Sequence, residues 1–112
     1  MKGLKDQVII VTGGAGGIGG ATCKRLAQEG AKVAVFDMNL AAAQRVVDDI
    51  KNAGGTALAV QCDITNKEVV DQSIVIAEAE LGAIDGLVNN AGWDIFKPFI
   101  KSTPDEWEKL IQ

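Results

Sequence analysis

Four short apolar runs, none of which alternates with polar residues, restrict the fold of this 112-residue chain more than any other feature. They are VIIVT (8–12), KVAVF (32–36), ALAVQ (57–61) and GLVNN (86–90). Runs of this length that are rich in valine or leucine and lack a polar face are typical of strands buried on both sides. The sequence therefore predicts four strands in one parallel sheet.

The segments between these runs have the periodicity of amphipathic helices. Apolar and small residues recur every three or four positions, as expected for one buried helix face. The three stripes are Gly19, Cys23, Leu26, Ala27 and Gly30; Leu40, Ala43, Val47 and Ile50; and Val70, Ile74, Ala77 and Leu81. The alternation predicts an α/β fold of order β-α-β-α-β-α-β, a doubly wound parallel sheet with right-handed crossovers.

Helix ends are marked by capping residues. Asn39 is a suitable N-cap for the second helix, and Thr65 with Glu68 predicts a capping box for the third. Glycines close the three helices, at Gly30, at Gly54 and Gly55, and at Gly82.

A fourth helix is expected near the C-terminus. Pro104 would be its first residue, and Thr103 with Glu106 would cap it. This helix is interrupted at Gln112, so we expect residues 1–112 to be one dinucleotide-binding portion of a longer, single-domain protein.

The glycine-rich stretch TGGAGGIGG, residues 12–20, follows the first expected strand and opens the first expected helix. In that context, glycines let a pyrophosphate approach the amides of a helix N-terminus, where the helix dipole favours anions. The stretch fits three spacings, which leave alternatives open: G-x-G-x-x-G on Gly14, Gly16 and Gly19, T-G-x-x-G-x-x-G on Gly13, Gly16 and Gly19, and T-G-x-x-x-G-x-G on Gly13, Gly17 and Gly19.

Asp37 directly follows the second apolar run. In this architecture, a carboxylate at that point accepts hydrogen bonds from the hydroxyls of an adenosine ribose. A cofactor with a 2′-phosphate would need cations nearby, and the neighbours Gly16 and Met38 are not basic. The sequence therefore predicts NAD. Asp63, just past the third run, is placed to accept a hydrogen bond from the adenine amino group.

Composition excludes several kinds of partner and chemistry. The net charge is −4 with no basic run, which argues against nucleic acid or an anionic membrane as a partner, and no stretch has transmembrane length. Cys23 and Cys62 lack metal or redox spacing, so we interpret both as packing residues in a reduced, cytoplasmic compartment and predict no metal site. The chain has no histidine or tyrosine to act as acid or base.

Four ordered motifs together resemble the short-chain dehydrogenases/reductases, in their compact oxidoreductase branch. These are the T-G-x-x-x-G-x-G glycines, the acid at position 37, DIT at 63–65 and NNAG at 89–92. The resemblance selects Gly13, Gly17 and Gly19 and leaves Gly14 and Gly16 as incidental fits to the other spacings. It implies a Rossmann-like fold and an NAD-dependent oxidoreductase that acts on a secondary alcohol or its ketone.

The resemblance also implies residue roles. Thr12 and Asn89 would brace the sheet. The family's catalytic asparagine, serine and Tyr-x-x-x-Lys would lie beyond Gln112, so no catalytic residue is expected in this chain, which alone should be inactive. A homotetramer is implied for the full-length protein. The implied cofactor contacts are Gly13, Gly14, Ala15, Gly16, Gly17, Ile18, Gly19, Asp37, Met38, Asp63, Ile64, Asn90, Ala91 and Gly92.

Two longer segments, 19–40 and 89–99, are similar to family members that act on alicyclic hydroxyacyl-CoA substrates. Trp93, Ile95 and Phe96 would form an apolar wall for the substrate ring. The same side chains would equally serve packing within a longer protein. A second functional hypothesis, which applies if the chain ends at residue 112, is a non-catalytic dinucleotide-binding half-domain.

Overall fold

The computed structural model describes residues 4–90. The elements follow one another as β1 (Val8–Thr12), α1 (Gly17–Gln28), β2 (Lys32–Asp37), α2 (Leu40–Asn52), β3 (Thr56–Gln61), α3 (Lys67–Leu81) and β4 (Ile84–Asn89). All strand pairs are parallel, and the sheet order is β3-β2-β1-β4. The predicted doubly wound, Rossmann-like α/β fold is confirmed. The predicted fourth helix, from Pro104, lies outside the described residues.

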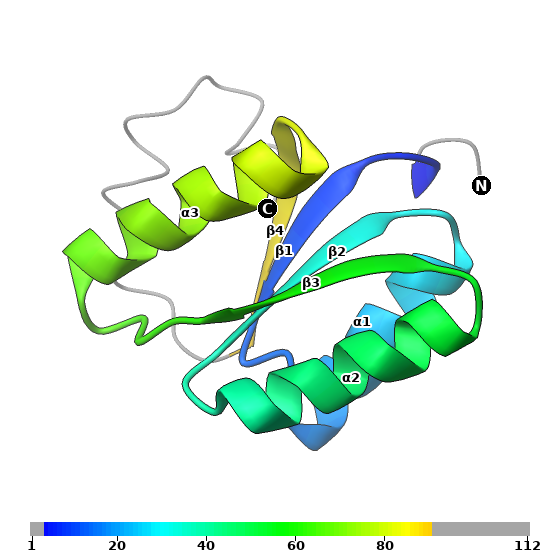
Figure 1. The fold of residues 1–112 in the computed structure, drawn as a ribbon, viewed down its shortest axis with the longest axis horizontal. Helices are drawn as coiled ribbons and strands as arrows, with labels where there is room; N and C mark the ends of the chain where they lie inside the picture. Colours follow the sequence, from blue (N-terminus) through cyan, green and yellow to red (C-terminus); the bar gives the residue numbers. More distant parts are fainter. Residues whose placement is uncertain (1–3, 91–112) are drawn as a thin grey trace.

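The two faces of the sheet are covered by different helices. Figure 1 shows α1 and α2 on one face and α3 on the other. Successive residues of a strand point to opposite faces, so Ile9 and Val11 pack with α1 and α2, while Ile10 packs with α3. Strand β1 is buried along its whole length, as predicted for a central parallel strand. Strands β2 and β3 are added on one side of β1, and β4 is added on the other side. Such a change in strand order is where folds of this kind bind ligands.

Strands β3 and β4 are less buried than the sequence predicts. Leu58 and Ala59 of β3, and residues at both ends of β4, are only partly covered. The reason is positional, because these two strands form the sheet edges within residues 4–90.

Helix α2 begins as predicted. Its N-cap is Asn39, whose Oδ1 accepts a hydrogen bond of 3.0 Å from the amide of Ala42. Two stripe residues are wrong, because Leu40 is exposed at the first turn of α2 and Gly30 is exposed beyond the end of α1. Val46 of α2 is buried in addition to the predicted positions. Gly30 and Gly54, which follow α1 and α2, and Gly82, which ends α3, all have positive φ, so the predicted glycine stops are confirmed.

The predicted capping box of α3 is wrong. The N-cap is Asn66, whose Oδ1 accepts a hydrogen bond of 3.2 Å from the amide of Val69. Thr65 cannot serve, because its amide and its hydroxyl both donate to Asp63 Oδ1. Asp63 therefore starts a side-chain-stabilised turn that delays the helix by one residue. Glu68 remains in the first turn, where the helix dipole favours an acid.

No helix in the described part of the chain is long and apolar enough to cross a membrane.

Candidate functional site

A cavity of about 310 Å³ opens where β1, β2 and β3 end. It is lined by the first loop glycine, the end of β2 and the segment after β3: Gly13, Phe36, Asp37, Met38, Cys62, Asp63, Ile64 and Thr65. Parallel strands bring their carboxyl ends to one edge, so segments distant in sequence meet here. The structure thus brings together at this cavity five of the residues that the sequence singles out: Gly13, Asp37, Met38, Asp63 and Ile64.

The glycine loop is attached to the end of β2. Gly13 has φ 64°, a conformation that favours glycine, and its amide donates to the carbonyl oxygen of Phe36 at 2.8 Å. The amide of Gly14 donates to the same oxygen at 3.3 Å. The loop therefore turns sharply away from β1 and lies beside β2.

Two loop glycines are required by close packing. A Cβ on Gly19 would overlap the carbonyl oxygen of Gly13, and a Cβ on Gly14 would lie 2.8 Å from a methyl carbon of Val35. The interpretation of Gly14 as an incidental fit to the ligand-binding spacing is not tested by this packing and stays a prediction. Position 14 must be glycine for a reason internal to the fold, which the spacing of ligand-binding glycines does not reveal.

Gly17 differs from these two. A Cβ there would meet no atom of the described chain within 4 Å, and Gly17 is the first residue of α1. The N-cap of this helix is Gly16, which has no side chain to accept from the first-turn amides. Ile18 is 80% exposed beside them. The start of α1 thus presents open space and unpaired donors, as a bound phosphate requires.

Asp37 is engaged by the backbone on both of its oxygens. Oδ2 accepts a hydrogen bond of 3.1 Å from the amide of Ala15, and Oδ1 accepts one of 2.9 Å from the amide of Asn39. A carboxylate offers about four lone-pair sites, so each oxygen retains room for a further donor such as a hydroxyl. Sequence reasoning missed these two backbone partners.

Asp63 lies across the cavity on the segment after β3. Its Oδ1 accepts from the Thr65 hydroxyl at 2.6 Å and from the Thr65 amide at 2.9 Å. These bonds, the hydroxyl first, hold the pKa of the Asp63 carboxyl below its ordinary value. The carboxyl is thus ionised at neutral pH and can accept from a ligand amino group.

Neither cysteine has the properties of a reactive thiol. Cys62 lines the cavity but is buried, and its burial raises the pKa of the thiol. Burial also raises the pKa of Cys23, to about 12. Both predictions of a packing role fit this environment.

Thr12 and Asn89 connect the ends of β1 and β4. The Thr12 hydroxyl donates to Asn89 Oδ1 at 2.8 Å, and the amide of Asn90 donates to the Thr12 hydroxyl oxygen at 3.2 Å. The interpretation of Thr12 and Asn89 as bracing residues is confirmed.

Another contact that the sequence does not suggest joins β3 to the turn after β2. Gln61 Nε2 donates to the carbonyl oxygen of Met38 at 3.1 Å. The contact depends on the pairing of Gln61 with Asp37 across the two strands, for which the local sequence offers no signal. Ala91, Gly92, Trp93, Ile95 and Phe96, which were predicted to lie near the nicotinamide and the substrate, fall outside the described residues.

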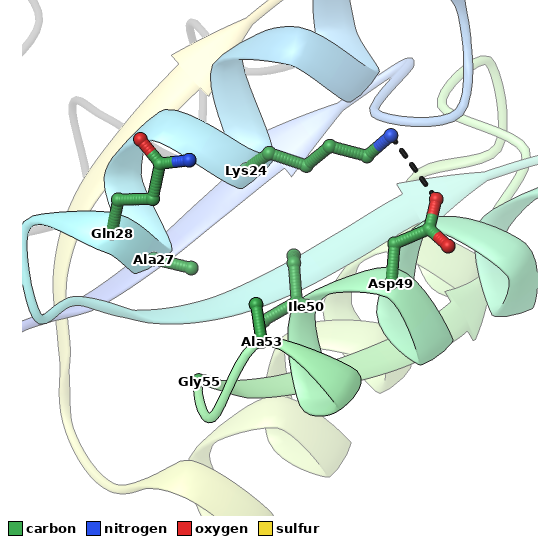
Figure 2. A pocket seen from close by; sticks show the side chains of 7 residues that line it. All are labelled: Lys24, Ala27, Gln28, Asp49, Ile50, Ala53 and Gly55. Atoms are coloured by element: carbon green, nitrogen blue, oxygen red, sulfur yellow. Dashed lines mark ion pairs between the residues drawn. The ribbon is translucent and has the colours of Figure 1, made fainter.

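A second cavity, of about 110 Å³, lies between α1 and α2 (Figure 2). Small and apolar side chains form its floor, and the ion pair of Lys24 and Asp49, at 3.1 Å, closes one end. The charges of Lys24 and Asp49 compensate each other. No residue of the glycine loop lines this cavity, and Asp37 does not line it either. The larger cavity at the strand ends is therefore the candidate site.

Comparison with known proteins gives consistent matches. Residues 7–112 match the family described as short chain dehydrogenase. The chain is 37% identical over 112 residues to a cyclopentanol dehydrogenase of Comamonas sp. (strain NCIMB 9872), covering 100% of this chain and 45% of that protein. It is 43% identical over 96 residues to a 7alpha-hydroxysteroid dehydrogenase of Escherichia coli (strain K12), covering 86% of this chain and 38% of that protein.

A solved structure of a 7alpha-hydroxysteroid dehydrogenase, complexed with NADH and 7-oxo glycochenodeoxycholic acid, has a TM-score of 0.78 to this chain. The two are 42% identical, and the match covers 80% of this chain and 35% of that one. The chain thus spans less than half of the length of each of these relatives.

Proposed function

This chain belongs to the short-chain dehydrogenase family, and on that premise we propose that it is the NAD-binding part of an oxidoreductase that transfers hydride between a secondary alcohol, or its ketone, and NAD. The observation that carries the proposal is the hydrogen bond from the Ala15 amide of the glycine loop to Asp37, a residue that lines the cavity together with Gly13 and Asp63. The relative whose structure contains NADH supports the choice of cofactor.

The residues at the cavity fit an adenine dinucleotide. The open space at Gly17 and the uncapped amides of Gly17, Ile18 and Gly19 suit a pyrophosphate. Gly13 through Gly16 shape the loop that leads the backbone to this point. The exposed side chain of Ile18 offers apolar cover beside the phosphates.

Asp37 would accept hydrogen bonds from the two hydroxyls of the adenosine ribose. It would use the carboxylate lone pairs that the amides of Ala15 and Asn39 do not occupy. Met38 follows it and adds no positive charge for a 2′-phosphate. Asp63 would accept from the adenine amino group, and Ile64 would cover the ring. These roles favour NAD over NADP.

Asn90, Ala91 and Gly92 would form the floor of the nicotinamide ribose, beyond the bond that joins Thr12 to Asn89. NAD, when bound, supplies the hydride acceptor for the alcohol carbon. The proton of the alcohol requires a base, which family resemblance assigns to a Tyr-x-x-x-Lys pair outside this chain. This chain's part in the reaction is to bind and orient the cofactor.

For the substrate we propose a cyclic secondary alcohol. Two relatives are named for alcohols on rings, cyclopentanol and a hydroxysteroid. Within that class, the similarity of segments 19–40 and 89–99 to 2-hydroxycyclohexanecarboxyl-CoA dehydrogenase favours an alicyclic hydroxyacyl-CoA, with Trp93, Ile95 and Phe96 against the ring. We further propose a cytoplasmic homotetramer, as the family resemblance implies.

The test uses the intact protein. NAD and NADP are titrated first, and we expect NAD to bind more tightly. Production of NADH is then followed with cyclopentanol, cyclohexanol, a hydroxysteroid and 2-hydroxycyclohexanecarboxyl-CoA. Turnover of ring alcohols supports the proposal. NAD binding without turnover of any alcohol would favour the binding module, and absence of NAD binding would contradict both.

Trp93→Ala tests the substrate wall. The substitution should raise the KM for a ring alcohol by more than it raises the Kd for NAD, because Trp93 would lie past the nicotinamide floor. An equal loss of both would assign Trp93 a structural role.

A further inference from the structure

The carboxylate of Asp37 joins three segments of the chain. Ala15, whose amide donates to Oδ2, belongs to the glycine loop, while Asn39, whose amide donates to Oδ1, is the N-cap of α2. Asp37 itself ends β2 and is half-buried. Only a carboxylate offers one acceptor oxygen to each of two such backbone donors, since an amide side chain would turn its own N–H₂ group towards one of them.

Other contacts also hold the glycine loop: the Cys23 thiol donates to the carbonyl oxygen of Gly14, the amide of Gly16 donates to the carbonyl oxygen of Gly13, and Ala15 packs against the core. Gly13 and Gly14 are anchored to the carbonyl oxygen of Phe36, but the loop continues through Ala15 and Gly16 before α1 begins. Glycine has no side chain to pack and the largest backbone entropy of any residue. Among the described residues, the bond from Ala15 to Asp37 is the hydrogen bond that connects this second half of the loop to β2.

We propose that Asp37 is a positioning residue for the glycine loop, and that it thereby promotes binding of the pyrophosphate in addition to its contact with the ribose. This inference rests on the proposed function, because it concerns the same cofactor site. Asp37 holds the Ala15 amide, which fixes the path of the loop into the first turn of α1, where the phosphates would bind.

The proposal and electrostatic repulsion alone predict opposite changes in the affinity for a phosphate-bearing ligand when Asp37 is removed. A carboxylate near a pyrophosphate repels it, so a role confined to the ribose hydroxyls means that removing Asp37 improves, or leaves unchanged, the binding of a ligand without those hydroxyls. If Asp37 positions the loop, its removal weakens the same ligand.

The experiment compares three ligands by calorimetry on the intact protein: ADP, 2′,3′-dideoxy-ADP and 2′,3′-dideoxyadenosine. The first has both hydroxyls and phosphates, the second has phosphates only, and the third has neither. Asp37→Ala is the main variant. Glu80→Ala, which removes an exposed carboxylate near the far end of α3, is the control for net charge.

Asp37→Ala should weaken 2′,3′-dideoxy-ADP by at least about fivefold, as expected for loss of a charge-assisted hydrogen bond that orders the loop. Dideoxyadenosine should bind both forms equally, because it makes no use of the loop. A general loss of structure would instead weaken both ligands. Hydrogen exchange of the segment 13–17 should be faster in Asp37→Ala than in wild type without ligand.

Asp37→Asn is the second variant, in case the alanine form does not fold. It preserves the shape of the side chain but deprives one backbone amide of its acceptor, so it should weaken dideoxy-ADP less than alanine does. Dideoxy-ADP affinity at or above wild type in every folded variant would overturn the inference. Wild-type protein that binds ADP leaves the proposed function intact in that case, whereas wild type that binds none of the ligands would overturn both.

Discussion

The side-chain hydroxyl of Thr12 donates a hydrogen bond of 2.8 Å to Oδ1 of Asn89, and so connects the carboxyl ends of two neighbouring parallel strands. The same hydroxyl oxygen accepts from the amide of Asn90. Thr12 is fully buried, whereas Asn89 is half-buried and Asn90 is exposed. The segment that continues from β4 into the predicted nicotinamide floor is thereby tied to the strand that carries the glycine loop.

Thr12→Val should destabilise the protein by about 0.5–1.5 kcal/mol, because it removes the hydrogen bond from the hydroxyl to Asn89 without changing the side-chain volume much, while the Asn90 amide keeps its bond to the Thr12 carbonyl oxygen. Thr12→Ser keeps the hydroxyl and should reduce the free energy of unfolding by less than Thr12→Val does. Unfolding in urea, monitored by circular dichroism, measures both. A valine variant as stable as wild type would mean that the bond contributes nothing net.

Substitutions at three loop glycines should separate packing from ligand binding. Gly14→Ala and Gly19→Ala force a Cβ against Val35 and against the Gly13 carbonyl, so each should cost about 1–3 kcal/mol of stability or more. Gly17→Ala meets open space and should fold normally, yet weaken NAD by at least about tenfold, if a phosphate occupies that space.

Melting temperatures and NAD titrations of the same three variants check this pattern. Unchanged NAD affinity in Gly17→Ala would remove the phosphate from the start of α1. Full stability of Gly19→Ala would contradict the close approach of Gly13 and Gly19.

Asp37 should set the preference between NAD and NADP. Hydrogen bonds to two ribose hydroxyls favour NAD, and repulsion of a 2′-phosphate disfavours NADP, so the preference should reach at least about a hundredfold. Asp37→Ala should narrow the ratio of the two dissociation constants by at least about tenfold without reversing it, since no cation follows at Met38. Titration of both cofactors measures the ratio, and an unchanged ratio would place Asp37 away from the ribose.

Thr65→Val should raise the pKa of Asp63 towards its ordinary value, because the Thr65 hydroxyl is the first cause of the depression. A carboxyl whose folded pKa is depressed contributes stability above its unfolded pKa of about 3.9, and that contribution is lost as the pH falls through the folded value. The valine variant should therefore have a smaller contribution than wild type above the unfolded pKa, and its loss should be complete at a higher pH because the folded pKa is higher. The titration of Asp63 by NMR, with Thr65→Ser as the control that keeps a hydroxyl, tests the cause directly, and identical titration curves in all three forms would exclude it.

The sequence determines the class of fold and most element ends because these depend on neighbours along the chain. The uninterrupted apolar runs at 8–12 and 32–36 would expose apolar side chains to water in a half-exposed strand, so they indicate strands buried on both sides. The helical periodicity of the segments that follow them identifies the buried face of each helix. Asn39 caps α2 through a bond to Ala42, three residues away. The capping box predicted at Thr65 fails for an equally local reason, because the amide and the hydroxyl of Thr65 both donate to Asp63.

Tertiary structure alone decides the rest of the site. Gly14 must lack a side chain because the pairing of β1 with β2 brings Val35 against it. The bond from Gln61 to Met38 exists because β3 pairs with β2 in one register. The sequence assigns Asp37 to a strand end, but the hydrogen bond that Asp37 accepts from Ala15 depends on how the loop folds back over β2. Sterics and hydrogen bonds between strands depend on register and three-dimensional approach, and a pattern of neighbouring residues carries neither.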